Sequence, residues 1–511
     1  MIQGTGSFVG KSVIVAGLCR LLKQDGFQVA PFKAQNMALN SFITPGGGEM
    51  GRAQVVQAEA ARLAPHVDMN PILLKPNTDI WAHVIIQGKV FGNMNADEYH
   101  RFKKKARVAV LESYGRLSRQ FQVIIIEGAG SPAEINLREG DLANMGIAEA
   151  VGAPVLLVGD IDKGGVFASL VGTLELLSVD ERSRIKGFII NKFRGDPSLL
   201  TPGLEFLEKK TGVPVLGVIP YLQGLYLPEE DGVALEKSFS PDEEAVNIAV
   251  LYLPHISNFT DFDPLEHEPD VNLRYVRPGQ RIGDAEVVII PGSKNTIEDF
   301  RFLKKEGYAD EILKLHQSGK MIIGICGGYQ MLGRAIRDPL GVETSWGEIE
   351  GLGLLEVETT LEREKMTFQV KAVTLNIPMV AQNVILQGYE IHMGDTQRGD
   401  AHPPAFKIIE RLGQKVEVED GAVSKDGRVW GTYLHGLFDN DEFRRSFVDS
   451  LRENKGLVSD DRPGEFDYRS FKEQEYDKLA AVLRKELDMP RIYKIIGMSS
   501  PSSPSPSGGI S

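Results

Sequence analysis

Cys326 lies in the segment of this 511-residue chain that is best suited to covalent chemistry. An apolar run at 321–325 leads into Cys326-Gly327-Gly328, and a helical pattern follows. A nucleophile on a sharp strand-to-helix turn is a nucleophile elbow, here with sulfur in place of a hydroxyl. The helix N-terminus lowers the pKa of such a thiol and favours the reactive thiolate. The other cysteine, Cys19, falls within an apolar helical stretch and is expected to be a buried small side chain.

A general base for this nucleophile should be a histidine further along the chain. The glycine-rich stretch 430–438 carries His435 and resembles the catalytic histidine segment of class I glutamine amidotransferases. That resemblance implies that Cys326 attacks the glutamine carboxamide and that His435 passes a proton to the leaving ammonia. Backbone amides near Gly327 and residues 291–294 are the expected oxyanion hole.

One position departs from the class I pattern. Many of these domains carry a glutamate two residues after the histidine, which orients the ring. Leu437 stands at that position in this chain. The site is therefore expected to be a Cys–His dyad, or to use another group to orient the ring.

A second chemical motif stands at the start of the chain, where a glycine-rich loop precedes an amphipathic helix. Backbone amides at such a helix N-terminus bind phosphate. Lys11 can reach the outer phosphates, and the Ser12 hydroxyl can ligate Mg²⁺. The loop runs from Gly4 to Gly10 and is one residue longer than a Walker A motif, because Thr5 stands at the expected first-glycine position. This spacing resembles the dethiobiotin synthetase branch of P-loop enzymes, and it predicts ATP and Mg²⁺ as cofactors.

Carboxylates that follow strands are the candidate metal ligands beside Ser12. Glu127 follows the apolar run 123–126, and the carboxyl end of a parallel strand is where a Mg²⁺ ligand belongs. Glu49, in a glycine-rich stretch, is a weaker second candidate, and a solvated loop carboxylate is the alternative for both. The P-loop resemblance adds two positions: Lys33, as a second lysine near the transferred phosphoryl group, and Asn191, as the residue that contacts adenine. For Asn191, a plain turn residue is the alternative.

The elements that must position these residues alternate between strands and helices. Apolar runs typical of buried parallel strands are separated by helical patterns in both halves of the chain. We therefore predict an α/β fold: a P-loop, doubly wound, mostly parallel sheet domain, followed by a class I glutamine amidotransferase-like α/β domain. The runs lie at 123–126, 154–158, 187–190, 248–253, 287–290 and 321–325.

Composition shifts divide the chain further. A polar segment separates the two halves of the chain. A C-terminal extension is predicted to hold a helix at 476–487, and the Ser/Pro/Gly-rich end is expected to be disordered. The predicted units are 1–236 for the ATP-dependent domain, 237–247 for a linker, 248–450 for the glutaminase domain, 451–497 for the extension and 498–511 for the tail.

Charge and cysteine content limit the classes of partner. The net charge of −13 argues against nucleic acid, which needs a basic face. No apolar stretch is long enough for a membrane span, and no secretory signal stands at the start. Two cysteines cannot form a disulfide framework, so a reducing cytoplasm is the expected setting. The oligomeric state stays open, a homo-oligomer included.

From about Gln3 to about Ser450 the chain resembles the cobyric acid synthase family, amidotransferases of adenosylcobalamin biosynthesis. The resemblance is carried, beside the two catalytic motifs, by the order of segments 3–12, 33–41, 127–136 and 159–162. It implies that ATP activates corrinoid carboxylates and that ammonia from glutamine converts them to amides. The expected substrates are adenosylcobyrinic acid a,c-diamide, which is amidated four times, glutamine and ATP. Amidotransferases of cobalamin biosynthesis also lack the orienting glutamate.

Two other functions remain open on the sequence. Cobyrinic acid a,c-diamide synthase has the same architecture and acts on different carboxylates. A P-loop scaffold ATPase with an inactive glutaminase domain is the non-enzymatic alternative, against which the intact Cys326 and His435 argue.

Overall fold

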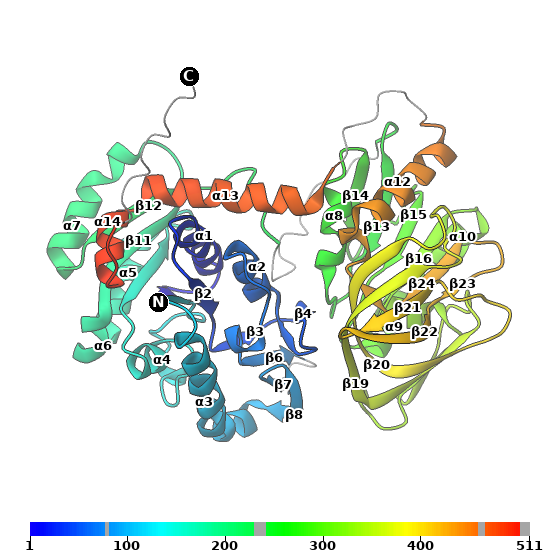
Figure 1. The fold of residues 1–511 in the computed structure, drawn as a ribbon, viewed down its shortest axis with the longest axis horizontal. Coiled ribbons are helices and arrows are strands. Elements are labelled where there is room, and N and C mark those ends of the chain that lie inside the picture. The colour runs from blue at the N-terminus through cyan, green and yellow to red at the C-terminus, as the bar shows by residue number, and fades with distance from the viewer. Residues whose placement is uncertain (77–80, 229–241, 458–465, 501–511) are drawn as a thin grey trace.

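The chain folds into two α/β domains, and a long helix near its C-terminal end runs from one to the other (Figure 1). The computed structural model describes residues 1–76, 81–228, 242–457 and 466–500. The predicted linker at 237–247 lies partly outside these residues, and only residues 498–500 of the predicted tail are described. Within the described ranges, no helix combines the length and the apolar character needed to cross a bilayer.

The central sheet of the first domain is parallel throughout, in the order β2, β9, β1, β10, β11, β12, with an isolated bridge between Ile2 and Glu127 joining β9 to β1. All six residues of β10 are buried, which suits a strand covered on both faces. Its strands are β1 (Ile2–Gly4), β2 (Val29–Phe32), β9 (Val123–Ile126), β10 (Val155–Asp160), β11 (Ile185–Phe193) and β12 (Val215–Pro220).

Side chains of β10 alternate between two cores, as a strand's period of two requires. Leu156 and Val158 join the core beneath α1, whereas Val155 and Leu157 join the core beneath α5 and α7. The sheet is therefore doubly wound, as predicted. The helices of this domain are α1 (Lys11–Gln24), α2 (Arg52–Ala60), α3 (Ala96–Ser118), α4 (Met145–Ala150), α5 (Val166–Leu176), α6 (Val179–Arg184) and α7 (Thr201–Thr211).

Two small sheets extend the first domain toward the second (Figure 1). One is a four-stranded sheet in the order β3, β6, β7, β8, and the other is the β4–β5 hairpin. Their strands are β3 (Gln35–Met37), β4 (Ser41–Ile43), β5 (Glu49–Gly51), β6 (Ile72–Pro76), β7 (Trp81–Ile86) and β8 (Lys89–Asn95).

The second domain has a six-stranded sheet in the order β14, β13, β15, β16, β24, β23, which is parallel except for the β23–β24 pair. Its strands are β13 (Val246–Leu251), β14 (Val271–Val276), β15 (Val287–Ile290), β16 (Met321–Ile325), β23 (Ala422–Val423) and β24 (Val429–Thr432). Its helices are α8 (Asp263–Glu266), α9 (Thr296–Lys305), α10 (Tyr308–Gln317), α11 (Gly327–Leu332) and α12 (Asp441–Lys455). The two sheets together confirm the predicted fold class.

A second, mostly antiparallel sheet follows in this domain and includes two long strands that pair with each other. Its strands are β17 (Ala335–Arg337), β18 (Glu348–Glu350), β19 (Val357–Thr374), β20 (Ile385–Arg398), β21 (Phe406–Arg411), β22 (Gln414–Asp420) and β25 (Leu434–His435). Strand β20 contacts the β4–β5 hairpin of the first domain through a small core of Ile43, Tyr389 and Ile391.

The C-terminal extension returns to the first domain. It consists of α13 (Tyr468–Glu486) and α14 (Met489–Ile495), and α13 starts beside the second domain and then runs along α1 (Figure 1). A Cβ at Gly17 of α1 would lie 2.4 Å from Leu483 Cδ1, so the two helices approach too closely for a larger residue there. Arg20, fully buried, forms ion pairs with two acidic residues of α13. The extension thus completes the core of the first domain.

Candidate functional site

The phosphate-binding loop is held in shape by the strands around it. It leads from β1 into α1, and the Thr5 amide donates to Val158 O at 2.9 Å. Gly10, just before α1, has φ +98°, and a Cβ there would lie 2.1 Å from Asn191 Nδ2. Asn191, on β11, donates its amide to Val9 O at 2.9 Å. Glycine at position 10 is therefore required both by conformation and by space, and that Asn191 contacts adenine stays a prediction.

The residues predicted to handle phosphate and metal gather at the end of β9. Glu127 accepts from Ser12 Oγ at 2.8 Å, pairs with Lys33 Nζ at 2.9 Å and accepts from Gln57 Nε2 at 2.5 Å. Burial opposes ionisation of Glu127, but the Lys33 charge and these hydrogen bonds keep its pKa below the usual range. Burial lowers the pKa of Lys11 to about 8, which the Glu127 charge partly opposes. The structure thus brings Lys11, Ser12, Lys33 and Glu127 together.

This donor set fits Mg²⁺ bound together with a nucleotide. Hard cations take oxygen ligands, and nucleotide Mg²⁺ sites use one or two protein oxygens with phosphate and water. Ser12 and Glu127 offer two oxygens, and Gln57 Oε1 is buried beside them without a hydrogen-bond partner among the described residues. In the same described ranges, no cluster of three His, Cys, Asp or Glu side chains forms a metal site of its own.

Glu49 lies in a different environment from the one predicted. Its carboxylate accepts from Ser41 Oγ at 2.8 Å, and its two oxygens pair with Lys75 Nζ at 2.9 Å and Lys365 Nζ at 2.5 Å. Burial opposes ionisation, but the Lys365 and Lys75 charges hold the pKa of Glu49 well below its usual range. Two ammonium groups already neutralise this carboxylate, so the environment does not suit a metal ligand. Glu49 instead joins the two domains, because Lys365 belongs to β19.

Cys326 occupies the sharp turn that the sequence predicts. It has φ 52° and ψ −109° between β16 and α11, a conformation that non-glycine residues rarely adopt. A Cβ at Gly328 would lie 1.9 Å from Ile290 O, and one at Gly324 would lie 2.6 Å from Gly328 C. The neighbouring glycines are therefore needed for the strand, turn and helix to pack. The thiol faces Ile391 O at 3.5 Å.

The orienting group that the sequence leaves open is Asp261. His435 Nδ1 lies 2.5 Å from Asp261 Oδ2, and the Gly436 amide donates to Asp261 Oδ1 at 3.1 Å. The Cys326 side chain is close enough to the ring to be among the groups that raise the His435 pKa. Burial opposes protonation of His435, but the Asp261 charge and hydrogen bond, with the contribution of Cys326, raise its pKa to about 10. The arrangement is a Cys–His–Asp triad rather than a dyad.

Asp261 comes from the short helical turn η5 (Phe259–Phe262) that follows β13. It stands 174 residues before His435, and its surroundings carry no motif that marks it. The pairing of β13 with β15, and of β15 with β16, brings it to the site.

Neighbouring groups complete the site. The Tyr389 ring stacks on His435 with centroids 5.2 Å apart and an interplanar angle of 16°. A Cβ at Gly327 would lie 3.0 Å from the Ser293 nitrogen, so the two segments predicted to supply oxyanion-hole amides are adjacent. His392 stacks on Tyr433, and burial lowers its pKa to about 3, so the ring is neutral.

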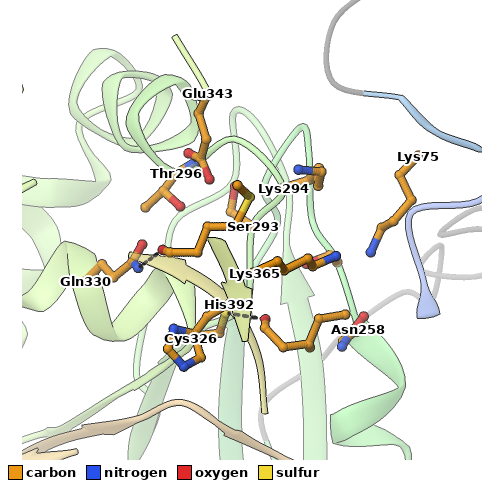
Figure 2. A pocket seen from close by; sticks show the side chains of 13 residues that line it. Lys75, Asn258, Ser293, Lys294, Thr296, Cys326, Gln330, Glu343, Lys365 and His392 are labelled. Atoms are coloured by element: carbon orange, nitrogen blue, oxygen red, sulfur yellow. Dashed lines mark hydrogen bonds between the residues drawn. The ribbon is translucent and has the colours of Figure 1, made fainter. Parts of the chain in front are cut away.

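A pocket of roughly 460 Å³, its open mouth included, lies over Cys326 (Figure 2). Its wall includes residues of the β15–α9 loop, of the middle of β20 and of β19. Lys75 of the first domain also lines it, so the pocket lies where the two domains meet.

Known proteins resemble the chain along nearly its whole length. Residues 1–234 match the family described as the CobQ/CobB/MinD/ParA nucleotide binding domain, and residues 247–443 match the CobB/CobQ-like glutamine amidotransferase domain. A protein named cobyric acid synthase from Thermoanaerobacter sp. (strain X514) is 55% identical over 97% of this chain and 98% of its own length.

Two further relatives carry the same name. The one from Syntrophobacter fumaroxidans is 50% identical over 98% of both chains, and the one from Yersinia enterocolitica is 53% identical over 97% of both. The chain therefore belongs to the cobyric acid synthase family, glutamine amidotransferases of cobalamin biosynthesis.

Proposed function

We propose that the protein converts adenosylcobyrinic acid a,c-diamide to adenosylcobyric acid by amidating four side-chain carboxylates. Each cycle couples two half-reactions, one in each domain. In the first domain, a corrinoid carboxylate attacks the γ-phosphorus of ATP and gives an acyl phosphate and ADP. Ammonia then attacks the acyl carbon, phosphate leaves, and the amide forms with loss of a proton.

The groups at the end of β9 have distinct tasks in the first half-reaction. Lys11 and Lys33 bind the phosphates and offset the negative charge that spreads over the transferred phosphoryl group. Ser12 and Glu127 would hold Mg²⁺, which would supply positive charge against the phosphates. Asn191 fixes the loop backbone through its bond to Val9 O.

The second domain releases ammonia. The Cys326 sulfur attacks the glutamine carboxamide, and His435 Nε2 gives the leaving nitrogen its proton. A thioester to glutamate remains, and water activated by His435 hydrolyses it. Asp261 holds the proton on Nδ1 and stabilises the imidazolium that forms. To the backbone amides of Gly327 and Ser293, which belong to adjacent segments, we assign the stabilisation of the oxyanion of each tetrahedral intermediate.

The single observation that carries this proposal is the buried Cys326–His435–Asp261 arrangement, whose Cys326 lines a pocket together with Lys75 of the ATP-dependent domain. A scaffold ATPase would have no use for an intact triad at this interface. The acceptor comes from the relatives, whose printed name is cobyric acid synthase.

The test is mass spectrometry of corrinoid products after incubation with Mg-ATP, glutamine and adenosylcobyrinic acid a,c-diamide. Stepwise conversion of four acids to amides is expected. The Cys326→Ala variant should lose conversion with glutamine and keep it with ammonium chloride. Double amidation of cobyrinic acid, without any change in the a,c-diamide, would instead assign the protein as cobyrinic acid a,c-diamide synthase.

A further inference from the structure

The pocket over Cys326 receives one charged side chain from the other domain. Lys75 lies on β6 of the first domain, is buried, and reaches toward Lys365 of β19 at the pocket wall (Figure 2). The remaining lining residues belong to the second domain. A pocket built from the second domain alone would therefore lack this ammonium group.

Positive charge exceeds negative charge around this pocket. Three lysines line it, together with one carboxylate, Glu343. Glu49 lies behind the wall and pairs with two of the lysines, Lys75 and Lys365. Three lysine side chains thus face two carboxyl groups.

Lys294 has no carboxylate partner within 4.0 Å in the described ranges, although its side chain is buried. Burial and the nearby Lys365 charge lower its pKa to about 7, although Glu343 opposes this. A buried cation without a partner is costly, and an anionic ligand group would relieve that cost. The pocket therefore favours a ligand that brings a negatively charged group close to Lys294, beside Cys326.

Glutamine carries three polar groups that such a pocket can distinguish: a carboxamide, an α-carboxylate and an α-ammonium group. Its carboxamide must lie against Cys326 for the reaction proposed above. We propose that its α-carboxylate binds Lys294 and Lys75, with its α-ammonium group against Glu343, so that the glutamine site is shared between the two domains. This inference rests on the proposed function and adds the residues that select free glutamine over other primary amides.

The shared pocket gives a physical reason for coupling between the two half-reactions. Strand β6 pairs with β3, which begins two residues after Lys33. Lys75 therefore sits on the sheet that also borders the phosphate site, and a complete glutamine pocket needs that sheet docked on the second domain. Glutamine should be hydrolysed efficiently only in the docked protein.

The experiment uses the full-length chain with Mg-ATP and the corrinoid acceptor, and compares glutamine with ammonium chloride as nitrogen donor. A hydrogen bond to a charged group contributes about 1.5–3 kcal/mol, so Lys75→Met and Lys294→Met should each raise the KM for glutamine by about 10-fold to 150-fold. Kinetics with ammonium chloride should change less than about twofold. Lys89→Met, at the exposed lysine of β8, is the matched control. It should change neither the KM for glutamine nor the kinetics with ammonium chloride.

Two further comparisons separate binding from folding. Lys75→Met alone would remove one of the two lysine partners of the Glu49 carboxylate. The double variant Lys75→Met/Glu49→Gln removes that carboxylate as well, and the same rise in the KM for glutamine is expected. With 4-aminobutanamide, which lacks the α-carboxylate, wild type and Lys75→Met should release ammonia equally well.

The inference is overturned if the KM for glutamine is unchanged in Lys75→Met and Lys294→Met, or if ammonium-dependent activity falls to the same extent in both. A wild-type protein that does not use glutamine at all would refute the proposed function itself. The two failures are therefore distinct.

Discussion

Replacing Asp261 by asparagine tests the triad most directly. The carboxylate accepts from His435 Nδ1–H across 2.5 Å and from the Gly436 amide across 3.1 Å. An asparagine of the same shape can still accept from Gly436, but its amide group would then face Nδ1 as a donor. The ring would carry its proton on Nε2, which is the nitrogen that must accept the thiol proton.

The expected loss can be worked out from the His435 environment. Its pKa lies at about 10, against an ordinary value of 6.5. At about 1.4 kcal/mol for each tenfold change in proton affinity, this corresponds to about 5 kcal/mol of imidazolium stabilisation, to which Asp261 makes the largest favourable contribution. A barrier higher by about 4–5 kcal/mol lowers kcat by about 10³-fold to 10⁴-fold. A tautomer change in a comparable triad costs about 10⁴-fold.

The assay is glutamate release from glutamine in the complete reaction, run beside amidation with ammonium chloride. The first should fall by about three orders of magnitude or more, and the second should be unchanged. Asp263→Asn is the matched control, because burial raises the pKa of Asp263 to about 8 and its carboxyl is already mostly neutral at pH 7. A fall of less than tenfold in Asp261→Asn, or an equal fall in the control, would show that His435 does not depend on Asp261.

Three other outcomes follow from the first domain. Gly10→Ala places a Cβ 2.1 Å from Asn191 Nδ2 at φ +98°, and should raise the KM for ATP about tenfold or more in ATP titrations while glutamine hydrolysis is kept. Glu127 has a depressed pKa, so its contribution to stability is full above about pH 4.5 and is lost as pH falls through the folded-state value. The melting temperature of Glu127→Gln should therefore lie below that of wild type at pH 7, and the gap should narrow on acidification to about pH 3. Leu483→Ala removes a buried contact between α13 and α1 and should destabilise the first domain by about 2–5 kcal/mol in thermal unfolding, whereas Val179→Ala, at a site 83% exposed, should have little effect.

Local motifs account for the parts of both sites that the sequence predicts. Cys326, Gly327 and Gly328 are consecutive, so the sequence alone specifies the strand-to-helix turn that carries the sulfur. The phosphate loop is equally local, since Gly10 and Lys11 fall at the start of α1. Helical periodicity likewise predicts a helix at 476–487, which overlaps the observed α13, but it does not predict that this helix packs on α1.

Long-range contacts account for what the sequence does not predict. Glu49 has the residue type and glycine-rich setting of a metal ligand, yet its environment is set by Lys365, 316 residues away in the other domain. The boundary between domains shows the same limit: β13 begins at Val246, inside the predicted linker, because strand pairing with β14 starts there.

The segment that carries Asp261 also contacts the first domain. Asn258, three residues before Asp261, accepts from the Ser41 amide of the first domain at 3.3 Å and donates to the Tyr389 hydroxyl at 3.2 Å. Tyr389 in turn stacks on His435. The group that orients the glutaminase base therefore lies on a segment that the first domain contacts directly. Because the carboxylate at His435 comes from this loop and not from position 437, where a leucine stands, we expect the geometry of the base to depend on docking of the two domains.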